Sequence, residues 1–281
     1  MSNVREKPKP RIIIATELAG LTHATTRGAI ELFERGISTT SRLITVGPWA
    51  KFAAQHLSTF DCGVALSFTS YNPLFPLSPI TSSPTLIDGR GFFPFSRAEF
   101  WEFADPKEVL RECRAQLERA VDLGINPTHI SSLDESLILR PEFFDVFVEV
   151  ASEFKVGVSL GTSNEVLGAG YVPREIISEE NLITTDKTLS FKDFPLNSTK
   201  GAITSFERLL QDLDIKTCEL AVEAAIYSQE TIDVFGIEKA SAQKISLEAL
   251  TLNRARRLLE EYGVKTISYQ ELMEESSKSS S

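Results

Sequence analysis

The sequence predicts an α/β fold, namely a distorted (β/α) TIM-like barrel with irregular excursions between its strands. Two observations carry this prediction. Short apolar runs typical of buried strands recur along the chain, and amphipathic stretches typical of helices separate them. This alternation over 281 residues favours a parallel sheet covered by helices, and the number of units favours a barrel over an open sheet.

The predicted strands and helices alternate through most of the chain. The strands are apolar runs at residues 11–15, 41–46, 62–68, 128–131 and 218–222. The helices are amphipathic stretches at residues 24–35, 49–56, 106–123, 141–154 and 247–261. We therefore expect each helix to bury its apolar face against the sheet.

Two regions lack the spacing of apolar residues that is typical of a strand or a helix. Residues 71–94 hold five prolines and predict a long irregular loop over one face of the barrel. Residues 163–195 contain Gly and Pro punctuation and predict a small insertion or a β-hairpin. We expect one domain over residues 1–273 and a disordered tail over residues 274–281, which are rich in Ser and Lys.

Composition narrows the function classes. The formal net charge of −10 argues against nucleic acid as a partner, because phosphate backbones need clustered Lys and Arg. The three cysteines form no CxxC pair, which fits a reducing cytoplasm. The basic N-terminus runs into only four apolar residues, so we expect neither export nor a membrane span.

Several short motifs follow one another in a fixed order. They read GLTHATTRGAIELFERGISTTS from Gly20, LIDGRGF from Leu86, LGINPTH from Leu123 and ELAV from Glu219. Together they resemble the YdjC-like carbohydrate deacetylases over nearly the whole chain. The resemblance implies a distorted barrel and a divalent metal that serves to hydrolyse the acetamide of N-acetylated sugars, especially chitooligosaccharides. Such chemistry also needs a carboxylate base and an acid for the leaving amine.

The resemblance indicates where the base and the acid would stand. The family pattern Ala-Asp-Asp-Phe-Gly appears here as residues 16–20, reading TELAG, which puts Glu17 at the position of the base. The family pattern His-Pro-Gly, whose His looks like the acid, begins here at Glu223. Glu17 and Glu223 are therefore the candidate catalytic residues.

The metal-binding positions of the family are changed. Leu18 stands at the position of the liganding Asp, while Ala65 and Leu133 stand at the positions of the two liganding His residues. Aliphatic side chains have no lone pair to offer a metal, whereas the scaffold motifs around them persist. We expect no tightly bound metal and no other cofactor.

The leading hypothesis is a catalytically degenerate deacetylase that retains a cleft for an oligosaccharide or small molecule, or acts through a protein partner. One alternative is an active hydrolase that uses a rebuilt carboxylate site, either as an acid and base pair or as a magnesium or calcium site. Its residues would be Glu17, Asp134, Glu135 and Glu223, at the carboxyl rim of the barrel. These carboxylates are also compatible with helix caps or a solvated surface. A second alternative retains metal-dependent deacetylation with Mg or Zn through a shifted register.

Two further residues are candidates for ligand binding. His129 lies in an apolar strand, where a buried and hydrogen-bonded histidine is the competing interpretation. Arg27 belongs to the Arg-Gly motif, where a tie between helix and loop competes with substrate binding. The sequence leaves open whether the chain forms a homodimer.

Overall fold

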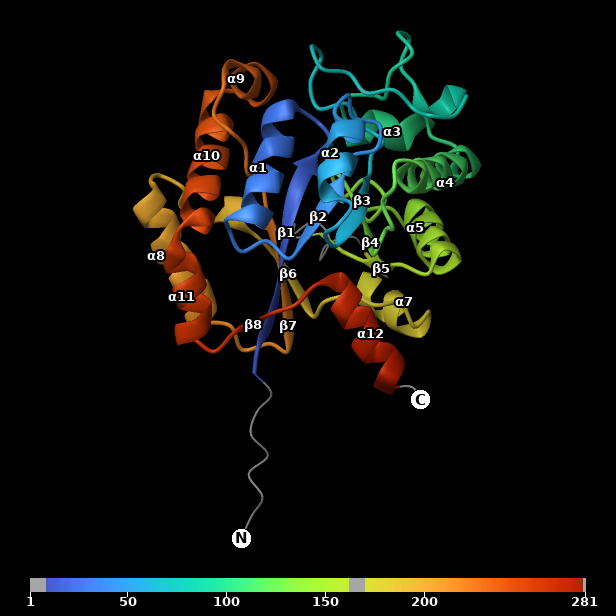
Figure 1. Ribbon diagram of the computed structural model, residues 1–281. Helices are drawn as coiled ribbons and strands as arrows, with labels where there is room; N and C mark the ends of the chain where they lie inside the picture. Colours follow the sequence, from blue (N-terminus) through green and yellow to red (C-terminus); the bar gives the residue numbers. More distant parts are fainter. Residues whose placement is uncertain (1–8, 162–169, 280–281) are drawn as a thin grey trace.

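The computed structural model describes residues 9–161 and 170–279 (Figure 1). A curved parallel sheet forms its centre, in the strand order β5-β4-β3-β2-β1-β7-β6, with β8 paired to β1. The strands are β1 (Arg11–Ala19), β2 (Thr40–Leu43), β3 (Cys62–Leu66), β4 (His129–Ser132), β5 (Gly157–Val158), β6 (Lys187–Ser190), β7 (Thr217–Val222) and β8 (Lys265–Thr266). The predicted fold class is confirmed as a half-barrel, a distorted relative of the TIM barrel.

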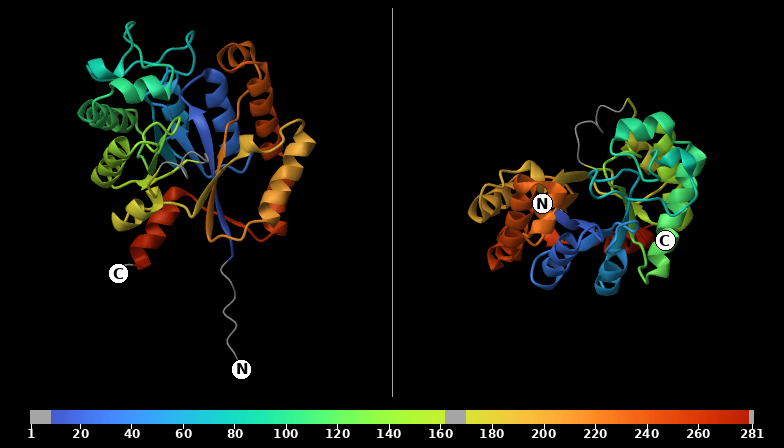
Figure 2. Two further views of the ribbon diagram at one scale, coloured as in Figure 1. Left: turned by 180° about the vertical axis from the view of Figure 1, so that it is seen from behind. Right: turned by 90° about the horizontal axis from the view of Figure 1, so that it is seen from above.

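Helices cover the outer side of this curved sheet (Figure 2). They are α1 (His23–Glu34), α2 (Ala50–Leu57), α3 (Arg97–Phe103), α4 (Pro106–Asp122), α5 (Pro141–Phe154), α7 (Pro173–Glu179), α8 (Thr199–Gln211), α9 (Gln229–Phe235), α10 (Ile237–Thr251), α11 (Asn253–Glu261) and α12 (Tyr269–Ser279). Two short 3₁₀ turns, η1 (Pro84–Leu86) and η2 (Phe191–Asp193), complete the described elements. None of the helices in these ranges combines the length and the apolar character that crossing a membrane requires.

The central strand β1 explains why apolar runs mark the sheet. Ile12, Ile13 and Ile14 are fully buried, because β1 pairs with β2 and β7 and both of its faces are covered. Local signals set the helix starts. The helix α4, for example, begins at Pro106 after Asp105, whose carboxylate accepts a hydrogen bond from the amide of Lys107.

The sequence predictions hold for most elements. All five predicted strands are present with shifted ends, and four predicted helices correspond to α1, α2, α4 and α5. The predicted helix over residues 247–261 is instead the end of α10 and the whole of α11, because the chain turns to an extended conformation at Leu252.

The region of residues 163–195 differs from the prediction. Residues 163–169 lie outside the described part of the chain, and the rest contains α7, β6 and the turn η2. For the described residues of this region the hairpin alternative is wrong, since β6 pairs with β7 in parallel and extends the main sheet. Its polar sequence, KTLS, lacks the apolar run that marks the other strands, because β6 lies at the end of the sheet order.

The C-terminal segment also differs from the prediction, because α12 continues through Ser279 instead of ending before a disordered tail. Arg11 of β1 forms an ion pair with Glu275 and so holds this helix against the bottom of the sheet.

The loop over residues 71–94 is irregular, as predicted, apart from η1 and an isolated bridge between Asn72 and Phe75. Figure 1 shows it at the same end of the molecule as α9, opposite the two chain termini. The buried Glu112 of α4 fixes it, because its carboxylate accepts hydrogen bonds from the amides of Ile80 at 3.0 Å and Thr81 at 2.9 Å. The excursion is therefore anchored by buried polar contacts.

Candidate functional site

A cleft of about 670 Å³ opens at the carboxyl ends of the strands. Its floor and walls come from the ends of β1, β4, β6 and β7 and from the loops that follow them. Parallel α/β folds place ligands at this edge of the sheet, where loops from several strands converge. The lining is mostly polar and includes seven Ser and Thr side chains, Thr69, Ser70, Ser131, Ser132, Ser159, Thr188 and Ser190.

All four carboxylates predicted from the sequence line this cleft. Glu17 lies in β1, Glu223 follows β7, and Asp134 and Glu135 follow β4. Asp134 is engaged in local structure, since it accepts hydrogen bonds from the hydroxyl of Thr69 at 2.7 Å and from a backbone amide at 3.1 Å. Topology thus brings the four residues together, and Asp134 also ties its own turn to the loop after β3.

Glu223 lies in a polar cluster at the side of the cleft. Its carboxylate forms an ion pair with Nζ of Lys239 at 2.8 Å and accepts a hydrogen bond from Nε2 of Gln243 at 3.2 Å. The ammonium group of Lys239 also lies 4.9 Å from the centre of the Tyr71 ring. The structure therefore presents Glu223 as one partner of an ion pair that a ligand can contact.

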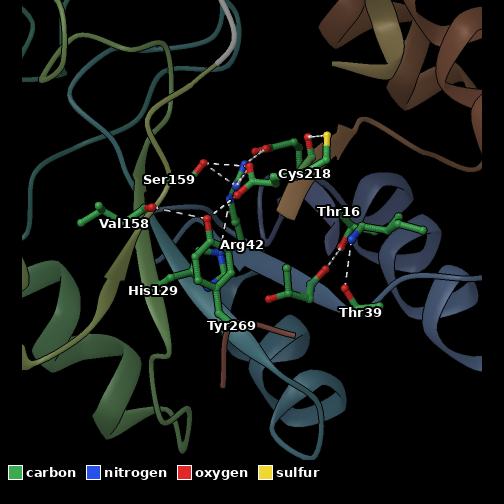
Figure 3. Close-up of polar contacts among 12 residues, drawn as sticks. Thr16, Thr39, Arg42, His129, Val158, Ser159, Cys218 and Tyr269 are labelled. Atoms are coloured by element: carbon green, nitrogen blue, oxygen red, sulfur yellow. Dashed lines mark hydrogen bonds and ion pairs between the residues drawn. The ribbon is translucent and has the colours of Figure 1, made fainter. Parts of the chain in front are cut away.

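The floor of the cleft is organised by Arg42 of β2 (Figure 3). Its guanidinium donates hydrogen bonds from Nη1 to Glu17, and from Nη2 to Glu219 and to the hydroxyl of Ser159 at 2.7 Å. Its Nε contacts Nε2 of His129 at 3.4 Å. Arg42 is 3% exposed and Glu219 is fully buried, so this ion-pair network lies inside the half-barrel.

Burial raises the pKa of Glu17 above its ordinary value, and the carboxylates of Glu219 and Glu223 act in the same direction. The neighbouring guanidinium of Arg42 opposes the shift. A carboxyl at the cleft floor with a raised pKa is suited to proton transfer, while Arg42 offers a fixed positive charge to a ligand oxygen.

His129 lies beneath the cleft and does not line it. It is fully buried, and burial lowers its pKa well below the ordinary value, with the cation of Arg42 adding to the effect. A Cβ atom at Gly63 would lie 2.5 Å from its Nδ1, so the absence of a side chain there gives the imidazole its space. His129 is thus a neutral core histidine that supports Arg42.

Arg27 does not join the other candidates. It is exposed on α1 and is absent from the lining of the cleft. The next residue, Gly28, explains the Arg-Gly motif, because a Cβ atom there would lie 2.5 Å from the carbonyl oxygen of Ala224. The motif allows α1 to approach the loop after β7.

Leu18, Ala65 and Leu133 stand where the family resemblance predicts metal ligands, and their side chains carry no atom that could bind a metal. Leu18 and Leu133 line the cleft, and Ala65 is fully buried in β3. Leu18 also has a φ of 66°, a left-handed conformation that disfavours Leu but brings no ligand atom. Within residues 9–161 and 170–279, no group of three or more His, Cys, Asp or Glu side chains is arranged to hold a metal ion.

Sequence reasoning missed the residues of the buried network: Arg42, Ser159, Glu219 and Tyr269. One signal was available, since an Arg and a Glu inside apolar strand sequences are costly to bury and so require partners. Which partners they have depends on parallel strands that are far apart in the chain.

Two hydroxyl groups in the cleft lining have no hydrogen-bond partner among the described residues. Ser131 of β4 and Thr188 of β6 are 5% and 7% exposed, and their oxygen atoms are unpaired. The two strands lie near opposite ends of the sheet order, so the curvature of the sheet brings the hydroxyls to one cleft. Buried polar groups normally find partners, and a polar ligand would supply them.

The fold and this cleft define a parallel α/β half-barrel protein with a polar cleft at the carboxyl edge of its sheet. The chain belongs to the YdjC-like family, because the family model described as YdjC-like protein matches residues 11–261. Among curated relatives, a carbohydrate deacetylase of Thermus thermophilus is 32% identical over 157 residues, which are 56% of each chain. A carbohydrate deacetylase of Brevibacillus brevis is 24% identical over 270 residues, which cover 93% of this chain and 99% of the relative.

The match thus spans little more than half the length of the Thermus relative and nearly the whole Brevibacillus relative. Among solved structures, one from Enterococcus faecalis named "putative cellobiose-phosphate cleavage protein" superposes with a TM-score of 0.78. It is 21% identical and covers 93% of this chain and 98% of its own. At this identity the likeness supports the fold.

Proposed function

We propose that this protein has lost the metal-dependent deacetylation associated with its family and retains a binding site for a small polyhydroxylated ligand, such as a mono- or oligosaccharide. The observation that carries the proposal is the contrast within one cleft. The metal-binding positions are Leu18, Ala65 and Leu133, whereas the walls keep a dense set of hydroxyl and charged groups. A hard divalent ion needs several converging oxygen or nitrogen ligands, but a sugar needs many individual hydrogen bonds.

The lining supports a neutral polar ligand over an anion. Five acidic and four basic side chains line the cleft, and the ion pairs Arg42–Glu17 and Lys239–Glu223 neutralise part of both sets. The unpaired hydroxyls of Ser131 and Thr188 supply donors and acceptors without charge. The aromatic rings of Tyr71 and Phe95 add apolar lining on which a sugar face can pack.

The first experiment combines metal analysis with an acetate-release assay on N-acetylated chitooligosaccharides, with and without added Mg²⁺ or Zn²⁺. The proposal expects neither stoichiometric metal nor acetate release. Metal at one equivalent together with release would show that deacetylation is retained and would end the proposal.

Ligand binding is tested by calorimetry with glucosamine, N-acetylglucosamine, cellobiose and chitobiose. We expect at least one of them to bind, and Ser131→Ala and Thr188→Val each to weaken that binding by about tenfold, the effect of one lost hydrogen bond. Ser241→Ala serves as the control, because this half-buried serine of α10 does not line the cleft. Absence of binding, or equal effects of all three variants, would contradict a sugar site.

A second candidate function is a metal-independent hydrolase that uses Glu17 and Glu223. The observation that favours it is that both carboxylates line one cleft and that burial, with a smaller contribution from the carboxylate of Glu223, raises the pKa of Glu17. Glycosidases use such a pair of carboxyl groups in different protonation states. A screen with nitrophenyl glycosides tests it, since Glu17→Gln and Glu223→Gln would each abolish activity while Glu118→Gln, an exposed control, would not.

A further inference from the structure

An ion pair at the side of the cleft holds a tyrosine hydroxyl. Tyr71 lines the cleft at the start of the irregular loop, and its phenol oxygen accepts a hydrogen bond from Nζ of Lys239. The same ammonium group pairs with the carboxylate of Glu223 at 2.8 Å. Because Lys239 uses the oxygen of Tyr71 as an acceptor, the hydroxyl proton is directed away from the ammonium group.

The position of Tyr71 is fixed by contacts with α9. Its ring meets the ring of Phe235 edge to face, with 4.8 Å between ring centres and 83° between ring planes. The next residue, Asn72, donates a hydrogen bond from Nδ2 to the carbonyl oxygen of Val234 at 2.6 Å. These contacts tie the start of the loop to the helix, so the phenol group is held at the wall of the cleft.

The hydroxyl proton of Tyr71 has no acceptor among residues 9–161 and 170–279. It can therefore be donated to an oxygen atom of a ligand in the cleft. If the proton is transferred fully, the hydrogen bond from Lys239 strengthens, because negative charge then develops on the phenol oxygen. The arrangement is that of a proton donor whose charged product is stabilised in advance.

Glu17 supplies a proton acceptor in the same cleft. Its Oε1 accepts a hydrogen bond from Arg42, whereas its Oε2 has no hydrogen-bond partner in the described part of the chain. Burial raises the pKa of Tyr71, and the carboxylates of Glu223 and Glu17 add to this shift, so Glu17 and Tyr71 lie close enough to interact. The raised pKa keeps Tyr71 protonated at neutral pH, which is the form that donates.

We propose that the cleft interconverts the two anomers of a reducing sugar, with Tyr71 as the proton donor, Glu17 as the proton acceptor and Lys239 as a positioning residue. The inference rests on the proposed function, since its substrate is the sugar that the cleft binds. The reaction needs one proton donor and one proton acceptor, and it consumes no co-reactant.

Ring opening balances between these two groups. The carboxylate of Glu17 takes the proton of the anomeric hydroxyl, a carbonyl bond forms at C1, and the bond from C1 to the ring oxygen breaks as that oxygen takes the proton of Tyr71. The open-chain aldehyde turns about its C1–C2 bond, and the ring closes on the other face of the carbonyl group. During closure the attacking hydroxyl returns its proton to Tyr71, and Glu17 returns its proton to the carbonyl oxygen. Both side chains therefore end in their starting forms.

Polarimetry tests the proposal with freshly dissolved single anomers of N-acetylglucosamine and of cellobiose. We expect the wild type to bring at least one of them to anomeric equilibrium about tenfold faster than buffer does, or more. Tyr71→Phe should lower kcat by about 100-fold, because the ring is kept and only the proton donor is lost. Tyr227→Phe is the matched control, since Tyr227 is 41% exposed and does not line the cleft, and it should leave the rate unchanged.

Two substitutions of Lys239 test its positioning role. Lys239→Met removes the ammonium group that stabilises the phenolate, so kcat should fall by about tenfold. Lys239→Arg keeps a charged donor and should restore most of this loss, which a merely structural role would not require. Equal rates in the two variants would overturn the role of Lys239.

Calorimetry with the same sugars separates this inference from the proposed function. A sugar that binds without faster interconversion would overturn the inference and leave the binding site in place. A catalysed rate that Tyr71→Phe or Glu17→Gln leaves unchanged would overturn it as well. If no sugar binds, the proposed function fails and the inference fails with it.

Discussion

The imidazole ring of His129 lies flat on the phenol ring of Tyr269, with 3.9 Å between ring centres and 10° between ring planes. This stack connects the C-terminal helix α12 to the middle of the sheet, since Tyr269 is its first residue and His129 begins β4. The phenol hydroxyl continues the connection to Glu219, the partner of Arg42. The last helix therefore reaches the cleft floor through three side chains.

We expect Tyr269→Phe to destabilise the protein by about 1–3 kcal/mol, because the buried carboxylate of Glu219 loses a hydrogen-bond donor while the ring stack is kept. Urea unfolding followed by circular dichroism measures the change. Tyr262→Phe is the matched control, since the hydroxyl of Tyr262 bonds to Gln211 near the surface and its loss should cost much less. Equal effects of the two substitutions would show that the hydroxyl of Tyr269 does not stabilise Glu219.

The raised pKa of Glu17 predicts a pH dependence of stability. In the folded state its pKa lies above the ordinary value of 4.5, so the folded protein binds the proton more tightly than the unfolded chain does. Stability therefore falls as the pH rises from the unfolded pKa towards the folded pKa.

The Glu17→Gln variant lacks the carboxyl group that binds this proton. The difference in melting temperature, variant minus wild type, should therefore increase as the pH rises from about 4.5 through the folded pKa of Glu17. Scanning calorimetry between pH 4 and pH 8 measures this difference. The exposed Glu118→Gln variant should show a flat difference, and a flat difference for Glu17→Gln would show that its pKa is not raised.

Thr188→Val is expected to leave stability unchanged or to raise it by up to about 1 kcal/mol, because the substitution removes a buried hydroxyl that has no partner among the described residues. Thr25→Val is the matched control. The hydroxyl of Thr25 donates to the carbonyl oxygen of Leu18 at 2.8 Å, so its removal should destabilise by about 1–3 kcal/mol. Chemical denaturation of both variants decides the point, and a destabilised Thr188→Val would mean that the hydroxyl has a partner in the folded protein.

The three thiols should be unreactive in the folded state. Burial raises the pKa of Cys62 and of Cys218 to about 12, and that of Cys113 well above its ordinary value. Because the thiolate is the reactive form, Ellman's reagent should modify none of them at pH 8 without unfolding. In about 6 M guanidinium chloride all three should react. Fast reaction of one thiol in the native protein would contradict its burial.

The sequence by itself determined the family and the alternation of strands and helices. The apolar run of β1 and the amphipathic face of α5 identify these elements. A strand buried on both faces shows a continuous run of apolar residues, whereas a helix buried on one face shows apolar residues every three to four positions. It also determined that Leu18, Ala65 and Leu133 cannot bind a metal, since that conclusion needs only the chemistry of the side chains. The meeting of Glu17, Asp134, Glu135 and Glu223 followed from parallel topology, which places their strand ends at one edge.

The tertiary structure alone decided what surrounds those carboxylates. The partners of Arg42 lie 25, 87, 117 and 177 residues away from it along the chain, and no local pattern encodes such contacts. The strand β6 escaped prediction because its half-exposed edge position needs no apolar run. The helix α12 escaped prediction because its first residue, Tyr269, is buried against His129 of a distant strand. The chemistry of each side chain and the spacing of apolar residues are local properties of the sequence. Charge compensation in a core depends instead on which strands the sheet brings together.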